Sequence, residues 1–146
     1  MEGALAPWDD SNLAATLSNV KTIAVVGFSA NPARPSNRVT RFLLAQGFDV
    51  YPVNPALASR ELLGLRVYDQ LASVPVPIDM VDVFRHPDFL PGVVAEAIDI
   101  GAGLVWPQLD VFNAAAERLA AENNMPMVID RCPAIEVPRL QAAGLL

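Results

Sequence analysis

Short apolar runs alternate along the chain with segments in which apolar residues recur at helical spacing. Continuous apolar runs of this length are typical of strands that are buried on both faces of a parallel sheet. Six runs are predicted strands, the third being the weakest: 22–26, 49–53, 66–68, 79–84, 103–106 and 127–129. Five segments are predicted helices: 9–20, 35–47, 90–100, 113–123 and a short helix after Val137.

This alternation predicts an α/β protein with a parallel sheet and helices on both faces. A Rossmann-like, doubly wound arrangement with the strand order 3-2-1-4-5-6 fits the pattern. Residues 1–146 are predicted to form a single domain, because the length suits one core and no linker or repeat interrupts the pattern. Such sheets bind ligands beyond the carboxyl ends of their strands. The candidate site therefore comprises four loops: 27–37, 53–57, 84–91 and 106–113.

Composition narrows the possible classes of function. Apolar residues make up 53% of the 146 residues, which argues against disorder. The net charge of −6 provides neither the basic field that attracts a nucleic acid nor a polybasic membrane patch. No signal peptide is visible, and no apolar stretch approaches the ~20 residues of a membrane span. The sequence thus predicts a cytoplasmic protein that binds neither nucleic acid nor membrane.

Two scarce residue types limit the chemistry further. Cys132 is the single cysteine, so an internal disulfide and a cysteine zinc cluster are excluded. His86 is the single histidine, which argues against a histidine-based metal site. We therefore predict no metal-binding and no catalytic residue.

The loop after the first predicted strand has the parts of a phosphate cradle. Gly27 allows backbone to come close to a ligand, and a helix that starts near Ser36 directs its positive dipole end toward the loop. Donor groups and positive charges cluster here: Ser29, Ser36, Asn37, Arg34 and Arg38. Arg41, one helical turn further on, is expected on a solvated face.

The same loop departs from the dinucleotide fingerprint. GxGxxG needs two more glycines than the segment that begins at Gly27 provides. NAD sites also tend to place an acidic residue at the end of the second strand, where this chain reads Pro-Val-Asn-Pro at 52–55. Both departures disfavour NAD and suit a ligand with more phosphate.

Five segments, spread in order over nearly the whole chain, form a recognisable set. They are VVGFSANPARPS (25–36), YPVNP (51–55), DMVDVFR (79–85), IDRCP (129–133) and, more weakly, WPQLDVFN (106–113). Together they resemble the CoA-binding domain family, in particular the small stand-alone bacterial proteins related to the CoA-binding domain of the succinyl-CoA synthetase alpha subunit. The resemblance implies a Rossmann-like fold and the binding of coenzyme A or a short acyl-CoA, without catalysis by the domain itself.

The resemblance also implies a set of site residues: Gly27, Phe28, Ser29, Ala30, Arg34, Pro35, Ser36, Asn37, Arg38, Val53, Asn54, Pro55, Phe84 and Arg85. The first four would lie along the pyrophosphate, and Arg34 and Ser36 would hold phosphate. Residues 53–55 and 84–85 would flank the adenosine part. Asp110 stands where the family usually has glycine, and its negative charge disfavours phosphate, so that loop is left out of the predicted phosphate site.

Four further residues have structural interpretations. Asp82 lies within a buried strand and is expected to hydrogen-bond with a neighbouring loop, because a buried carboxylate requires partners. Trp106 is expected in the core. Gln108 is left open between a ligand contact and a hydrogen bond within its loop, and His86 is given no catalytic role.

Cys132 leaves two interpretations open. It follows the last predicted strand beside Arg131, whose charge would favour a thiolate that forms a mixed disulfide with CoA. The alternative is a buried, inert thiol.

Two other functions also stay open: an acyl-CoA-using enzyme and an interaction subunit of a CoA ligase or synthetase. The sequence also leaves open whether the protein forms a homo-oligomer.

Overall fold

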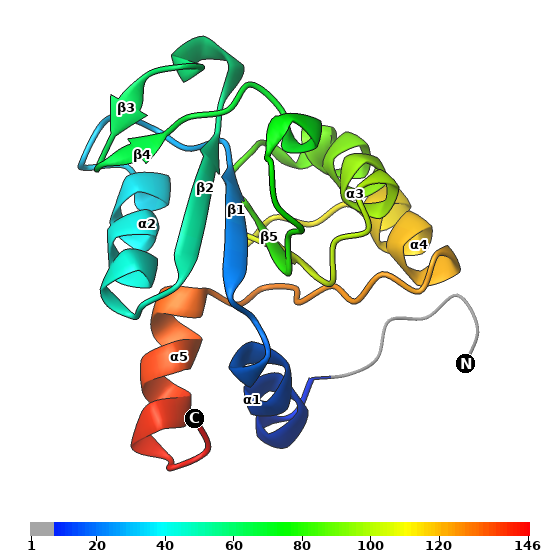
Figure 1. Ribbon diagram of the computed structural model, residues 1–146. Coiled ribbons are helices and arrows are strands. Elements are labelled where there is room, and N and C mark those ends of the chain that lie inside the picture. Colours follow the sequence, from blue (N-terminus) through cyan, green and yellow to red (C-terminus); the bar gives the residue numbers. More distant parts are fainter. Residues whose placement is uncertain (1–7) are drawn as a thin grey trace.

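Four parallel strands form the centre of the computed structural model, which describes residues 8–146 (Figure 1). They are β1 (Thr22–Val26), β2 (Asp49–Val53), β5 (Met80–Val83) and β6 (Val105–Pro107). Their order is β2-β1-β5-β6, all pairs being parallel. The predicted Rossmann-like α/β fold and its central strand order are therefore confirmed.

The two outermost predicted strands are reduced to single bridges. Tyr68 pairs with Val53 and Met127 with Val105, each as one isolated parallel bridge. Arg66, predicted in the third strand, belongs instead to an antiparallel hairpin of β3 (Glu61–Leu62) and β4 (Leu65–Arg66). Its two-residue turn, Leu63–Gly64, has positive φ at both positions, which matches the twist of a tight hairpin.

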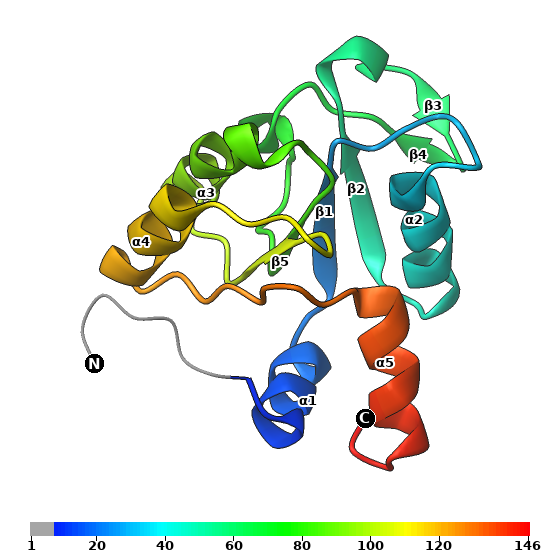
Figure 2. The same cartoon turned by 180° about the vertical axis from the view of Figure 1, so that it is seen from behind.

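Helices lie on both sides of the sheet, and two of the five within residues 8–146 extend beyond the end where its strands begin (Figures 1 and 2). One face packs against α1 (Asp10–Ser18), α2 (Pro35–Ala45) and α5 (Pro133–Ala142), and the other against α3 (Leu90–Asp99) and α4 (Ala114–Glu122). Three short 3-10 helices complete the described chain: η1 (Pro55–Leu57), η2 (Leu71–Ser73) and η3 (Pro87–Phe89). Helices on both faces confirm the doubly wound arrangement, and Trp106 is buried in the core as expected.

The last helix begins earlier than the sequence predicts. Instead of following Val137, α5 starts at Pro133, with Cys132 at the N-cap. Proline fits the first turn of a helix because its missing N–H has no partner there in any case. The helix continues through Pro138 even though that residue removes one backbone donor.

A charged network fastens α5 to the segment before β1. Glu136 is buried and accepts hydrogen bonds from Arg131 at 2.6 Å and from Arg139 at 3.1 Å. Arg139 also holds both carboxylate oxygens of Asp10 in α1, at 2.8 and 2.9 Å. Burial by itself would raise the pKa of Glu136. The hydrogen bonds from Arg139 and Arg131 outweigh this effect, so the pKa is lowered. The network therefore joins the two ends of the described chain.

Asp82 differs from its sequence interpretation. It is fully buried in β5, opposite Val25 and Trp106, and neither carboxylate oxygen has a hydrogen-bond partner among residues 8–146. The expected contact with a loop was wrong, because both strand neighbours present apolar side chains at this level of the sheet. Burial raises the pKa of the Asp82 carboxyl well above its usual range.

Candidate functional site

Gly27 makes the tight turn at the end of β1. Its φ is +86°, and a Cβ atom at this position would lie 2.4 Å from the carbonyl oxygen of Phe84. The N–H of Gly27 donates to the Val53 carbonyl at 3.0 Å. Only glycine therefore lets the ends of β1, β2 and β5 come together at the carboxyl edge of the sheet.

The start of α2 lies directly above this turn. Arg34 occupies the N-cap without a capping side-chain hydrogen bond, and Pro35 is the first helical residue. The buried Ser36 hydroxyl accepts a hydrogen bond from the Ser29 N–H at 3.0 Å, and the Asn37 side-chain amide donates to the Ser29 carbonyl at 2.9 Å. These two contacts fix the loop over the helix terminus, whose positive dipole end favours an anion.

A cavity of about 450 Å³ opens beside this helix start; we call it the cradle cavity. Its lining residues come from the loops after β1, β5 and β6: Gly27, Ser29, Arg34, Pro35, Ser36, Phe84, Arg85, Gln108 and Val111. No carboxylate is among them. Within residues 8–146, neither Arg34 nor Arg85 has a side-chain hydrogen bond or ion pair, so both guanidinium groups are available to an anionic ligand.

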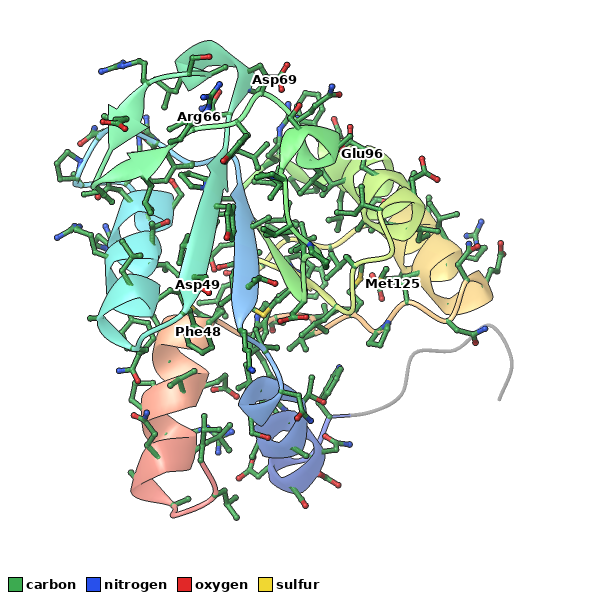
Figure 3. The ribbon with its side chains drawn as sticks, in the orientation of Figure 1. Phe48, Asp49, Arg66, Asp69, Glu96 and Met125 are labelled. Carbon is green, nitrogen blue, oxygen red and sulfur yellow. The ribbon has the colours of Figure 1, made fainter. Side chains whose placement is uncertain are left out.

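A second cavity of about 600 Å³ continues from the first; we call it the acidic cavity. It shares Gly27, Phe84 and Arg85 with the cradle cavity. Its other lining residues are Val26, Val53, Asn54, Pro55, Asp69, Gln70, His86, Phe89 and Glu96. Figure 3 shows Asp69 and Glu96 at the same end of the sheet, away from the end where Asp49 begins β2.

Arg85 forms the division between the two cavities. Its guanidinium carbon lies 4.0 Å from the centroid of the Phe89 ring, a cation–π arrangement. Its Cγ atom also limits the space at Gly27, at 3.0 Å from an ideal Cβ. The side chain is exposed, so the guanidinium can reach a ligand in either cavity.

Ten of the fourteen predicted site residues line these two cavities, and the remaining four do not. Phe28 is fully buried, and only its carbonyl faces the site, where it accepts from the Asn54 amide at 2.8 Å. Ala30 and Asn37 line a separate cavity of about 140 Å³ next to Arg41. Arg38 turns back and donates to the Ala33 carbonyl at 2.6 Å.

Arg41 lies on a solvated face of α2, as expected, and it also supports the loop. It is exposed, but its guanidinium donates to the Asn37 side-chain oxygen at 3.0 Å and to the Pro32 carbonyl at 2.9 Å. Arg38 and Arg41 thus support the loop from behind, while Arg34 faces the cavity. Sequence position alone does not distinguish these three arginines.

Several lining residues were not predicted. Gln108, which was left open, and Val111 reach the cradle cavity from the loop after β6. Asp69 and His86 lie in loops at the carboxyl edge, which is the only signal that pointed to them. Glu96 comes from the middle of α3, and its position depends on helix packing that no local motif encodes.

Cys132 is a buried thiol rather than an activated one. It is only 6% exposed, and burial raises its pKa. Arg131, the expected activating neighbour, is hydrogen-bonded to Glu136 and to the Trp8 carbonyl instead. The interpretation as a thiolate was therefore wrong, and the mixed disulfide loses its basis.

His86 shows no arrangement for proton transfer. Its Nδ1 atom accepts from the N–H of Asp88 at 3.2 Å and lies 3.6 Å from the Asp88 carboxylate. These contacts close a turn of η3. In the part of the chain described, no group of three or more His, Cys, Asp or Glu side chains is arranged to hold a metal ion. No helix within 8–146 has the length and apolarity needed to cross a membrane.

Comparison with known proteins identifies the family. The CoA-binding domain family matches residues 21–138. The chain belongs to this family. The uncharacterized protein YneT of Bacillus subtilis is 35% identical over 116 residues, which cover 80% of this chain and 84% of YneT. The alpha subunit of ADP-forming acetate–CoA ligase I from Pyrococcus furiosus is 30% identical over 93 residues, 61% of this chain but only 20% of that subunit.

Solved structures agree with this assignment. A protein from Thermus thermophilus, cell-free ID.343, superposes with a TM-score of 0.87 at 39% identity, covering 91% of this chain and 99% of that one. A hypothetical protein from Pyrococcus horikoshii OT3 gives a TM-score of 0.88 at 37% identity, with 92% and 93% covered. Acetyl-coenzyme A synthetase 1 of Ca. Korarchaeum cryptofilum gives a TM-score of 0.64 at 27% identity, covering 77% of this chain and 26% of the synthetase chain.

Proposed function

We propose that this protein binds coenzyme A or a short acyl-CoA in the two joined cavities and performs no catalysis by itself. The observation that carries the proposal is the start of α2, where Arg34 and Ser36 face a cavity that contains two unpaired guanidinium groups and no carboxylate. A helix terminus with such neighbours suits the diphosphate of CoA. Family membership supports this ligand over other phosphate compounds.

The acidic cavity suits the adenine and ribose of the ligand, and Arg85, which lines it as well, can pair with the 3′-phosphate that CoA carries on its ribose. Asn54 and Pro55, which are predicted to flank adenosine, are among the residues that line this cavity. Asp69 and Glu96 supply carboxylate oxygens, which accept hydrogen bonds from amino and hydroxyl groups. The volumes of about 450 and 600 Å³ are both within the usual range of ligand sites.

The chemistry of the two candidate reactive residues supports binding without turnover. The Cys132 thiol is buried and its pKa is raised, so it is a poor nucleophile near neutral pH. His86 makes its hydrogen bond within its own turn. An acyl-CoA-using enzyme is the alternative, and acyl-CoA turnover by the pure protein would favour it. The cytoplasm remains the predicted compartment.

A second candidate is an interaction subunit of a CoA ligase or synthetase. It is favoured by one observation: this chain matches a segment that makes up only 20% of the acetate–CoA ligase alpha subunit. The CoA-binding domain would then need the remaining domains of such a ligase from a partner chain to take part in ligation. Co-purification of a ligase-type subunit would support this function.

Titration calorimetry of the pure protein with CoA, NAD and ATP tests the main proposal. CoA is expected to bind clearly tighter than NAD, because the loop after Gly27 lacks the GxGxxG glycines and the end of β2 lacks an acid. Equal or tighter binding of NAD would contradict the proposal. Mass spectrometry of small molecules released from the purified protein provides an independent measurement.

A further inference from the structure

The strand order determines where the two ends of a long ligand lie. In the order β2-β1-β5-β6, residues 53–55 after β2 and residues 108–112 after β6 are at opposite ends of the carboxyl edge. The start of α2 and Arg85 lie between them. CoA carries its diphosphate between adenosine and the pantetheine arm. If the adenosine lies over 53–55, the thiol end therefore extends toward 108–112.

That second loop carries two exposed apolar side chains and a half-buried one, which together we call the apolar rim: Leu109, Phe112 and Val111. Val111 lines the cradle cavity, while Leu109 is 38% and Phe112 53% exposed. The Asn113 amide donates to the Pro87 carbonyl at 3.1 Å, which fastens the loop to the segment after β5. Leu109 and Phe112 are chain neighbours of Gln108 and Val111, which line the cradle cavity, and exposed apolar side chains next to a ligand cavity are typical of a binding surface.

The charges within and beside the loop itself are negative, while Arg34 and Arg85, which line the cradle cavity with Val111, are expected to pair with the phosphate groups of CoA. Asp110 lies within the loop, and its N–H donates to the carboxylate of Asp130 at 3.1 Å. No lysine or arginine occurs between 107 and 113. A ligand group that ends in a carboxylate would lose hydration here and meet two like charges. An apolar group would instead cover apolar surface that is otherwise exposed to water.

We propose that the apolar rim binds the acyl group of an acyl-CoA, so that the site prefers short apolar thioesters to free CoA and to acyl groups that end in a carboxylate. The inference rests on the proposed function, that is, on CoA binding at the cradle cavity. The strand β6 lies two strands from β1, about 10 Å at ~4.8 Å per strand. An extended pantetheine arm can cross that distance.

Calorimetry with CoA, acetyl-CoA, butyryl-CoA and succinyl-CoA tests the inference. Affinity is expected to rise by about two- to four-fold for each methylene from acetyl to butyryl, as for partial to full burial of a CH₂ group. Succinyl-CoA has the same chain length as butyryl-CoA and differs in its terminal carboxylate. It is expected to bind at least about ten-fold more weakly than butyryl-CoA, because the carboxylate must give up hydration.

A double variant, Leu109→Ser with Phe112→Ser, assigns the effect to the rim. Both side chains are substantially exposed, so the fold should tolerate the changes. The variant should lose the preference for butyryl-CoA while its affinity for CoA stays within about two-fold of the wild type. Leu145→Ser, which removes an exposed leucine at the distant C-terminus, is the matched control and should keep the preference.

The outcomes separate this inference from the proposed function. If the wild type binds CoA but binds butyryl-CoA no more tightly, the inference is overturned and CoA binding stands. If the double variant keeps the full preference, the rim is not the acyl site, and the inference is again overturned. If neither CoA nor any thioester binds, the proposed function itself fails, and the inference fails with it.

Discussion

The Cα of Gly27 faces the carbonyl of Phe84 so closely that a single added carbon would lie 2.4 Å from its oxygen. This approach joins the loops after β1 and β5 at the floor of both cavities. Because φ at Gly27 is +86°, a side chain there would also be strained in its own backbone. Any substitution of Gly27 therefore has two separate free-energy costs, the clash with Phe84 and the strain of its own backbone.

Gly27→Ala is expected to destabilise the fold by more than the ~1–2 kcal/mol of left-handed strain alone and to abolish CoA binding. Gly47→Ala is the matched control, since Gly47 has a φ of +91° but open space around it. Urea denaturation of both variants measures the difference in free energy of unfolding. Equal losses in the two variants would contradict the close approach of the Phe84 carbonyl.

Arg34→Ala is expected to weaken CoA binding by about 1.5–3 kcal/mol, the usual value for a charged hydrogen bond. Arg34 lines the cradle cavity and has no partner among residues 8–146, so its loss should leave stability nearly unchanged. Calorimetry at two salt concentrations provides the measurement, and the wild type should lose more affinity in high salt than the variant.

Arg41→Ala should act differently, because Arg41 supports the loop through Pro32 and Asn37 rather than facing the cavity. We expect a smaller loss of CoA affinity than for Arg34→Ala and little change in its salt dependence. Arg118→Ala, an exposed arginine on α4, should change neither property. A larger loss for Arg41→Ala than for Arg34→Ala would mean that the phosphates lie elsewhere.

Hydrophobic patterning predicted the fold because each central strand is a continuous apolar run that is buried on both faces. It failed at the edges of the sheet. Tyr68 and Met127 each join the sheet through one isolated bridge, and Arg66 pairs instead with Glu61 in the β3–β4 hairpin. The hairpin turn at Leu63–Gly64 needs a leucine at positive φ, which turn propensities do not favour.

The residues of the candidate site could likewise be predicted only in part. Residues that make up the loops after β1 and β2 could be predicted, because the carboxyl ends of parallel strands always meet at one edge. Contributions from elsewhere depend on packing. Glu96 reaches the acidic cavity from within α3, and Arg41 holds the cradle loop from the second turn of α2. Neither has a local signal in the sequence.

Cys132 is expected to react slowly in the native protein. Its thiol is buried and its pKa is raised by burial, so little thiolate is available to attack a disulfide. Incubation with CoA disulfide should therefore give no adduct in native buffer and a reducible adduct of CoA mass in urea. Intact-protein mass spectrometry measures both. Rapid native modification that is lost in Cys132→Ser would contradict the buried position.

Asp82 predicts a pH dependence of stability. Its pKa in the folded protein is raised by burial, while in the unfolded chain it has the ordinary value of about 3.9. The folded state thus binds a proton that the unfolded state releases. Between the unfolded and the folded pKa, stability falls as pH rises, by up to about 1.4 kcal/mol for each pH unit.

Asp82→Asn should remove this dependence, because the amide stays neutral at every pH. Near pH 4 the variant and the wild type are expected to have similar free energies of unfolding, since both side chains are then uncharged and both lack partners. Toward pH 8 the variant should become increasingly more stable than the wild type.

The difference in free energy of unfolding between the two proteins cancels the effect of groups that titrate in both. Glu136 is one such group, because its lowered pKa stabilises the fold near neutral pH and this stabilisation is lost as pH falls. Urea denaturation at several pH values gives the difference directly. A constant difference across this range would mean that Asp82 is ionised in the fold and has a partner that neutralises it.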